Sequence, residues 1–241
     1  MISFCAMSDA GGREYNEDRV EVLVTDDRWC CILADGLGGM GGGAEASKAA
    51  VDTLKACFED GFMQPDTLHE CCQRAHRAIQ QKKRELGQRG KLYSTIVLVF
   101  GTENMLWWTH SGDSRLYLFK DGHVCAQTKD NSVPQMLVAC GEITPQEIRN
   151  HPDRNRILAC LGTDDEVAKL SKVGQMEITE GLSGLLCTDG FWEPVVEEEM
   201  IGRLEREKDV QKWIRNMVRY IQQQDLGQEQ DNFSAIGFVV E

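Results

Sequence analysis

The sequence predicts an α+β fold in which mostly antiparallel sheets pack on each other and are flanked by helices. Short runs rich in β-branched and aromatic residues come in clusters, and polar turns separate the runs within a cluster. Segments with helical periodicity lie between these clusters, instead of following every strand as in a parallel fold. No internal repeat, low-complexity tract or proline-rich linker divides the 241 residues, so we expect a single domain over residues 1–241.

The first part of the chain predicts two strands followed by two helices. The strands cover 20–25 and 29–34, on either side of a polar turn, and a glycine-rich stretch at 36–43 follows the second. Beyond it, apolar residues recur every three or four positions, which is typical of one helix face. The two predicted helices carry these residues at Ala46, Ala50, Leu54 and Phe58, and, after a cap at Asp66, at Leu68, Cys72, Ala75 and Ile79.

The rest of the chain returns to strands and ends with one more helix. Asp121-Gly122 is a hairpin-turn signal, and residues 129–165 are polar and irregular with helical pieces. An amphipathic helix is predicted from Val210 to Ile221. The predicted strands are 94–100, 105–110, 115–119, 123–127, 182–188 and 234–240.

The composition disfavours several classes of protein. Lys and Arg number 26 against 39 Asp and Glu, and the resulting net charge of -13 disfavours nucleic acid and anionic membrane surfaces as partners. No run approaches the roughly 20 apolar residues of a membrane span, and the first residues do not resemble a secretory signal. The ten cysteines form no Cys-x-x-Cys pair and favour free thiols in a reducing compartment. We therefore expect a cytoplasmic protein without membrane insertion.

Acidic residues stand at the ends of several predicted strands. Asp35 and Asp189 each end an apolar run beside a glycine, Asp113 lies between two strands, and Asp231 opens the last strand. One Asp-Gly pair is a turn by default, and an acidic composition can serve solubility alone. A sheet, however, brings distant strand ends together, and clustered carboxylates repel one another unless a cation neutralises them. Because hard oxygen ligands favour Mg²⁺ or Mn²⁺, the pattern suggests a divalent metal site.

The ordered set of motifs resembles the metal-dependent protein phosphatase family, the type 2C serine/threonine phosphatases, in its bacterial branch. The resemblance implies a four-layer αββα sandwich, with two mostly antiparallel sheets flanked by helices. The matching segments span residues 13 to 234 in the family's order. They are Arg13-x-x-Asn16-Glu17-Asp18, Ala34-Asp35-Gly36-Leu37-Gly38-Gly39, Gly43-x-x-Ala46-Ser47, Gly112-Asp113-Ser114-Arg115, His151-Pro152-x-Arg154-Asn155, Leu161-Gly162, Cys187-Thr188-Asp189-Gly190-Phe191-Trp192-Glu193 and Asp231-Asn232-Phe233-Ser234.

The resemblance also implies a centre of two core Mn²⁺ or Mg²⁺ ions, with a third, weaker ion beside them. In that centre Asp35 bridges the two core ions. Asp189 and Asp231 complete the protein ligands of the first ion, and the carbonyl group of Gly36 contacts the second.

Further residues take supporting roles by the same resemblance. Asp18 is another metal residue, Glu17 acts on the metals through water, and Asp113 helps to hold the third ion. Arg13 binds the substrate phosphate, so Arg13 and Asp35 are the expected catalytic residues. A phosphorylated protein is the expected substrate, and a bacterial serine/threonine kinase or its targets are the expected partners in signalling.

The chemistry of a phosphate monoester agrees with these roles. The dianion repels hydroxide, so the nucleophile must be generated near neutral pH, and a water that bridges two cations has a lowered pKa and can attack in line. The guanidinium group of Arg13 matches the geometry of phosphate oxygens. Leu37 stands where some family members, mostly eukaryotic, carry a histidine that protonates the leaving group. We therefore expect water to supply that proton here.

Two rival interpretations remain. The stretch Gly36-Leu37-Gly38-Gly39-Met40-Gly41 is a literal Gly-x-Gly-x-x-Gly and could indicate a dinucleotide site, but the surrounding strands do not form a parallel unit. Alternatively, the chain could be a catalytically weak phosphatase fold that acts as a regulatory or binding module. Such a module should have lost its metal carboxylates, whereas this chain retains five aspartates at the expected positions.

Overall fold

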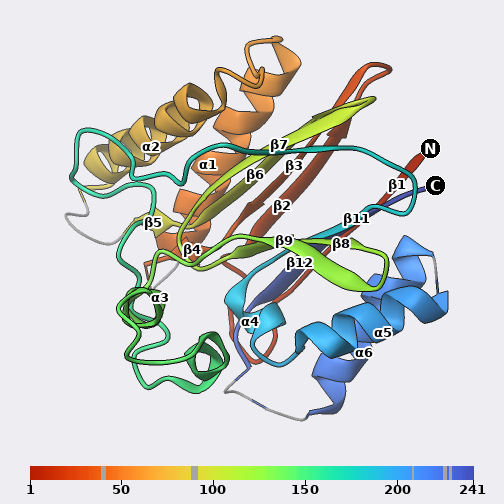
Figure 1. The fold of residues 1–241 in the computed structure, drawn as a ribbon. Coiled ribbons are helices and arrows are strands. Elements are labelled where there is room, and N and C mark those ends of the chain that lie inside the picture. The colour runs from red at the N-terminus through yellow and green to blue at the C-terminus, as the bar shows by residue number, and fades with distance from the viewer. Residues whose placement is uncertain (39–41, 88–91, 208, 225–226, 228–229) are drawn as a thin grey trace.

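Two five-stranded antiparallel sheets form the centre of the molecule (Figure 1). The computed structural model describes residues 1–38, 42–87, 92–207, 209–224, 227 and 230–241. One sheet has the strand order β1 (Ile2–Asp9), β12 (Phe233–Val240), β11 (Ser183–Cys187), β8 (Arg115–Lys120) and β9 (His123–Gln127). The other has the order β10 (Gly174–Glu177), β7 (Met105–Ser111), β6 (Ile96–Thr102), β3 (Arg28–Ala34) and β2 (Arg19–Val24).

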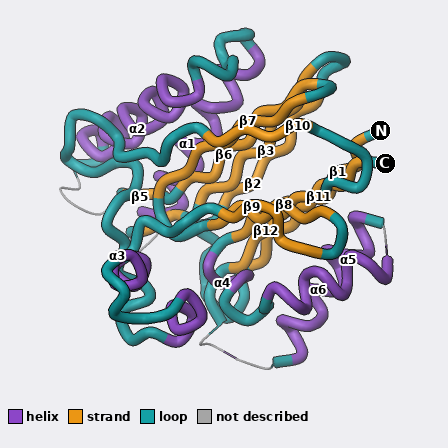
Figure 2. Tube along the Cα trace, viewed as in Figure 1, coloured by secondary structure: helices purple, strands orange, loops and turns teal. Residues whose placement is uncertain are grey.

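Helices cover the outer face of each sheet, which confirms the predicted αββα sandwich (Figure 2). Helices α1 (Gly42–Glu59) and α2 (Leu68–Glu85) pack on the β3 sheet, and α5 (Glu197–Glu207) and α6 (Val210–Gln223) pack on the β12 sheet. The short α4 (Asp189–Trp192) follows β11 directly. Helix α3 (Val133–Ala139) and the 3-10 helix η1 (Pro145–Asn150) lie in the segment between β9 and β10. None of the described helices is long and apolar enough to cross a membrane.

Strand β3 shows why the two sheets lie in the middle of the sandwich. Every residue from Trp29 to Ala34 is buried, although alternate side chains of a strand point to opposite faces. Cys30 and Ile32 face the α1–α2 layer, whereas Cys31 and Leu33 face the other sheet. A strand covered on both faces must be apolar throughout, which explains the continuous apolar run in the sequence.

The predicted elements lie close to observed ones, but β1, β10 and α5 were not predicted, and two details of the predicted elements differ. The predicted strand at 94–100 is divided into β5 (Tyr93–Ser94), which pairs with β4 (Gly36–Leu37), and the longer β6. The cap predicted at Asp66 is wrong, because α2 begins at Leu68 with Thr67 in the cap position. The hydroxyl group of Thr67 instead bonds to the main chain of the preceding turn, where it accepts from Gln64 N at 2.8 Å.

The predicted free thiols are confirmed, since all ten cysteines are unpaired and six of them are buried.

Candidate functional site

The five predicted metal aspartates lie where strand ends meet at one edge of the two sheets. Asp18 precedes β2 and Asp35 follows β3, and these two ends are paired through Arg19 and Ala34. Asp189 follows β11, whose end pairs with the start of both β8 and β12. Asp113 and Asp231 each lie two residues before one of those two strands. The chain termini lie at the opposite end of the sheets (Figure 1).

A direct hydrogen bond joins the two sheets at this edge. The hydroxyl group of Thr188, next to Asp189, donates to Asp18 Oδ2 at 3.1 Å. The same hydroxyl accepts from the main-chain N–H group of Ser234 at 3.0 Å. Carboxyl groups from both halves of the sandwich are therefore held in one place by the pairing of the strands and by the side chain of Thr188.

The carboxyl groups raise one another's pKa because they are enclosed and close together. Burial raises the pKa of Asp18 to about 7, and the neighbouring charge of Asp231 adds to the shift. Burial also raises the pKa of Asp113 to about 7, with a further contribution from Asp130. Asp35 and Asp189 stay partly open to solvent, yet the protein around them and the other carboxylates raise the pKa of both well above the ordinary range. The site therefore concentrates negative charge with too little positive charge to balance it.

Two carboxylate oxygens in this cluster are buried without a partner. Neither Asp18 Oδ1 nor Asp113 Oδ1 has a hydrogen bond from a described residue, although the two side chains are only 1% and 3% exposed. Buried polar atoms are normally satisfied, so each unpaired oxygen needs an explanation. A divalent cation would accept these lone pairs and offset the charge of the cluster. Among the described residues, however, no three His, Cys, Asp or Glu side chains already surround a common point as ligands of one ion. The donor set therefore fits a hard cation by its chemistry and its charge.

Glycine is required where the main chain comes close to the carboxylates. A Cβ atom on Gly36 would lie 2.1 Å from the carbonyl oxygen of Gly43 at the start of α1. A Cβ atom on Gly190 would lie 2.2 Å from the carbonyl oxygen of Asn232. These close approaches explain why glycine follows Asp35 and Asp189. The carbonyl oxygen of Gly36, a predicted metal contact, would in turn lie 2.3 Å from a Cβ atom on Gly43, so it packs closely against the main chain of α1.

The loop that carries Arg13 and Glu17 is fixed by Asn232. The Asn232 side-chain amide donates to the carbonyl groups of Ala10 and Tyr15, both at 2.9 Å, and its oxygen accepts from Glu17 N at 2.8 Å. The carboxylate of Glu17 then accepts from Gly43 N at 3.1 Å. The predicted motif around Asp231 and the predicted motif around Glu17 are therefore one structural unit.

Arg13 stands at the mouth of a cavity of about 410 Å³. Its guanidinium group donates to Asp231 Oδ2 at 3.1 Å, and half of the side chain remains exposed. The cavity extends from Asp189 and Asp231 to the segment between β9 and β10. Its lining residues include Arg13, Asp189, Glu193, Asp231, Arg149 and Arg154.

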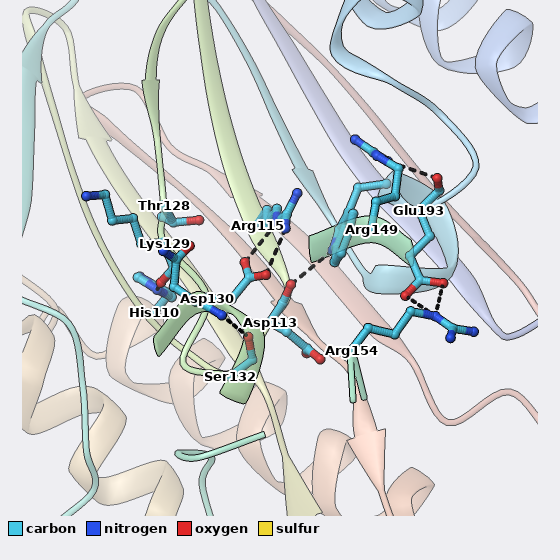
Figure 3. Close-up of polar contacts among 12 residues, drawn as sticks. His110, Asp113, Arg115, Thr128, Lys129, Asp130, Ser132, Arg149, Arg154 and Glu193 are labelled. Atoms are coloured by element: carbon cyan, nitrogen blue, oxygen red, sulfur yellow. Dashed lines mark hydrogen bonds and ion pairs between the residues drawn. The ribbon is translucent and has the colours of Figure 1, made fainter. Parts of the chain in front are cut away.

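A buried network supports Asp113 from behind (Figure 3). The indole N–H of Trp192 donates to the carbonyl group of Asp113 at 3.0 Å. The guanidinium carbon of Arg115 lies 3.4 Å from the centre of the Trp192 ring. Arg115 is itself paired with both oxygens of Asp130 at 2.8 Å, and both partners are buried. Sequence reasoning missed the role of Asp130, because a single aspartate in a polar segment gives no signal of its own.

Two ion pairs attach the segment between β9 and β10 to the region after α4. Arg154 pairs with Glu193 at 3.0 Å (Figure 3). Arg149 pairs with Glu197 at 3.0 Å. The motif at 151–155 contributes one of these contacts through Arg154. His151 makes only a local one, in which its Nδ1 accepts from Asp153 N at 3.1 Å.

Two further points concern residues near the site. His110 is buried with its Nε2 2.8 Å from the carbonyl oxygen of Lys129, which is a structural contact. Burial lowers the pKa of His110, which keeps the ring neutral. The strand before the glycine-rich stretch is antiparallel to both of its neighbours, so the dinucleotide interpretation is wrong. Residues 39–41 of that stretch lie outside the described residues.

Comparison with known proteins gives a consistent result. A family model described as Protein phosphatase 2C matches residues 8–232. The serine/threonine protein phosphatase PstP of Mycobacterium tuberculosis is 32% identical over 208 residues, which cover 85% of this chain and 39% of PstP. The protein phosphatase PhpP of Streptococcus pneumoniae is 32% identical over 194 residues, 77% of each chain. The chain thus spans about two fifths of the length of PstP.

Solved structures are similar over the whole chain. The crystal structure of the M. tuberculosis phosphatase PstP has a TM-score of 0.86 and 28% identity, and the match covers 100% of this chain and 99% of that one. The catalytic domain of PstP in complex with two manganese ions has a TM-score of 0.83 and 27% identity, with the same coverage.

Proposed function

Because the chain belongs to the protein phosphatase 2C family, we propose that it hydrolyses phosphoserine and phosphothreonine in proteins at a site for two Mn²⁺ or Mg²⁺ ions. The observation that carries this proposal is the cluster of aspartates from both sheets, with buried oxygens at Asp18 and Asp113 that no described residue satisfies. Without a cation here, repulsion among the carboxylates would lower the free energy of unfolding. The catalytic domain of PstP binds two manganese ions on the same fold, which supports the assignment.

We assign the roles of the aspartates as the family resemblance implies, and their positions support the assignment. Asp35 would bridge the two ions, since carboxylates from both sheets, Asp18 and Asp189 foremost, act on it. Asp189 and Asp231 lie on adjacent strand ends and would hold one ion together. Asp18, the Gly36 carbonyl and, through water, Glu17 would face the other ion, and Asp113 would hold a third. When bound, the ions would supply a water of lowered pKa and neutralise charge on the phosphoryl oxygens.

Arg13 would bind the substrate phosphate. Only one of its nitrogens is paired, with Asp231, and the rest of the guanidinium group has no hydrogen bond with a described residue. The exposed group lines the cavity beside Asp189 and Asp231, so a phosphate could be held between Arg13 and the metals. Leu37 provides no proton donor, so the leaving serine or threonine oxygen would take its proton from water.

The proposed partners are phosphorylated proteins, including a bacterial serine/threonine kinase or its targets. PstP and PhpP are named as protein phosphatases, and the matched region contains the full set of proposed metal residues. We place this activity in the cytoplasm, as expected from the free thiols.

The test is turnover of a phosphothreonine peptide with added Mn²⁺ and with a chelator. We expect release of inorganic phosphate only with the metal, and a loss of several orders of magnitude in Asp35→Asn. The exposed Asp66→Asn, in the turn before α2, is a matched control and should behave as wild type. A protein that binds phosphopeptide but releases no phosphate at any metal concentration would be a binding module, and the proposal would be wrong.

A further inference from the structure

A buried hydroxyl group links the positions of two proposed metal residues that come from different strands. We propose that Thr95 is a positioning residue that fixes the place of Asp35 relative to Asp113 and thereby sets the affinity for metal. This inference rests on the proposed function. It goes beyond it because Thr95 is no metal ligand and lies in none of the motifs found in the sequence.

Thr95 and its neighbour Ser94 hold the main chain of Asp35 on both sides. The N–H group of Asp35 donates to Thr95 Oγ1 at 3.0 Å, and the carbonyl group of Asp35 accepts from Thr95 N at 2.8 Å. Ser94 Oγ donates to the same carbonyl group at 3.1 Å. Asp35 lies just beyond the ladder between β3 and β6, so a side-chain oxygen replaces the main-chain acceptor that a regular ladder would provide.

The other side of Thr95 contacts the turn that carries Asp113. Thr95 Oγ1 and Ser114 Oγ share a hydrogen bond of 2.8 Å. A Cβ atom on Gly112 would lie only 2.6 Å from the methyl carbon of Thr95, so that methyl group packs directly against the glycine. Gly112 and Ser114 flank Asp113. One threonine side chain therefore contacts the main chain of Asp35 and both neighbours of Asp113, through Gly112 on one side and the Ser114 hydroxyl on the other.

Burial makes this contact rigid. Ser94, Thr95 and Ser114 are fully buried, so water cannot replace a hydroxyl group that is removed. Removal of the Thr95 hydroxyl would leave the Asp35 N–H group without its acceptor and would free the Ser114 hydroxyl to turn away. Both proposed ligands would then lose their support in one step. Groups that orient metal ligands typically change metal affinity about 10-fold to 100-fold when they are removed.

The variants separate the hydroxyl group from the shape of the side chain. Thr95→Val keeps the branched shape and the contact with Gly112 but removes the hydroxyl group, whereas Thr95→Ser keeps the hydroxyl group and removes the methyl group. Thr109→Val is the matched control, because Thr109 is equally buried and its hydroxyl donates to the carbonyl group of Ser171, with no hydrogen bond to Asp35 or to the turn around Asp113. Ser114→Ala removes only the second hydrogen bond.

The experiment is a calorimetric titration of each metal-free protein with Mn²⁺, together with peptide turnover at saturating Mn²⁺. We expect Thr95→Val to weaken Mn²⁺ binding about tenfold or more, with Thr95→Ser and Thr109→Val close to wild type. Wild-type affinity in a folded Thr95→Val would overturn the inference while leaving the proposed function intact. If Thr95→Val does not fold, Ser114→Ala decides, since an unchanged Mn²⁺ affinity there would equally overturn the inference.

Failure of the proposed function gives a different pattern. A wild-type protein that binds Mn²⁺ but releases no phosphate would contradict the phosphatase activity, and the order of Mn²⁺ affinities among the variants would still support or overturn the role of Thr95. A wild-type protein that binds no Mn²⁺ would overturn both.

Discussion

The carboxyl group of Asp18 should make the metal-free protein less stable as the pH rises. Burial raises its pKa from the ordinary 3.8 to about 7. Between these two values the unfolded chain releases the proton and the folded chain keeps it, so a rise in pH favours unfolding. The stabilisation from the protonated Asp18 is complete below the unfolded-state pKa of 3.8 and is lost as the pH rises through the folded-state pKa of about 7. From about pH 5 to about pH 7, Asp18 alone should lower the free energy of unfolding by about 2 kcal/mol.

A thermal melt monitored by calorimetry measures this effect. For a chain of this size, about 2 kcal/mol corresponds to a melting temperature about 4–8 °C lower near pH 7 than near pH 5. The measurement is made with a chelator and repeated with Mn²⁺, which should remove most of the difference because the ions offset the carboxylate charges.

The matched variants show whether Asp18 is responsible. Asp18→Asn has no proton to lose, so its metal-free melting temperature should change less with pH than that of the wild type. Asp66→Asn, which alters an exposed aspartate, should follow the wild type. If Asp18→Asn kept the full pH dependence, or if the metal-free wild type became more stable as the pH rose, the reasoning about the buried carboxylates would be refuted.

Three further predictions follow from the site and its support. Arg13→Ala should raise the KM for a phosphopeptide about tenfold or more with a smaller change in kcat, because a charge-assisted contact to phosphate is lost before the transition state; an unchanged KM would contradict the assignment. Asp113→Ala should raise the Mn²⁺ concentration for half-maximal activity about tenfold, and an unchanged Mn²⁺ response would exclude a role in metal binding. Arg115→Ala should lower the free energy of unfolding by about 3–5 kcal/mol in a denaturant titration, because it leaves Asp130 buried without its partner. The exposed pair of Arg156 provides the control, and Arg156→Ala should change stability little.

Much of the fold could be predicted because its strands have clear local signals. The fully buried β3 gives a continuous apolar run, and α6 shows one apolar face along its whole length. Strand β1 was not predicted, since Ile2–Asp9 is only half-buried and mixes serine, cysteine and alanine with apolar residues. It becomes a strand because it pairs along its full length with β12, more than 220 residues away. Such a distant pairing leaves no trace in the local pattern.

The aspartates of the site could be predicted from their place beside glycine at strand ends, but their supports could not. Helix α2 carries a row of polar residues that bind the main chain of the segment before β10. His76 accepts from Gly162 N at 3.1 Å, Gln80 donates to the carbonyl group of Thr163 at 2.8 Å, and Lys83 pairs with Asp164 at 2.9 Å. A polar row on a helix normally indicates a face in water. Only the three-dimensional structure shows that another part of the chain covers this face.

The origin of the carboxylates also bears on when the protein becomes able to act during its synthesis. Asp18 lies near the first strand of the chain and Asp231 just before the last, and Asn232 secures the loop of Arg13. A nascent chain on the ribosome therefore cannot assemble the proposed centre until β12 has emerged and docked between β1 and β11. If the proposed function is correct, products truncated before β12 should release no phosphate from a phosphopeptide.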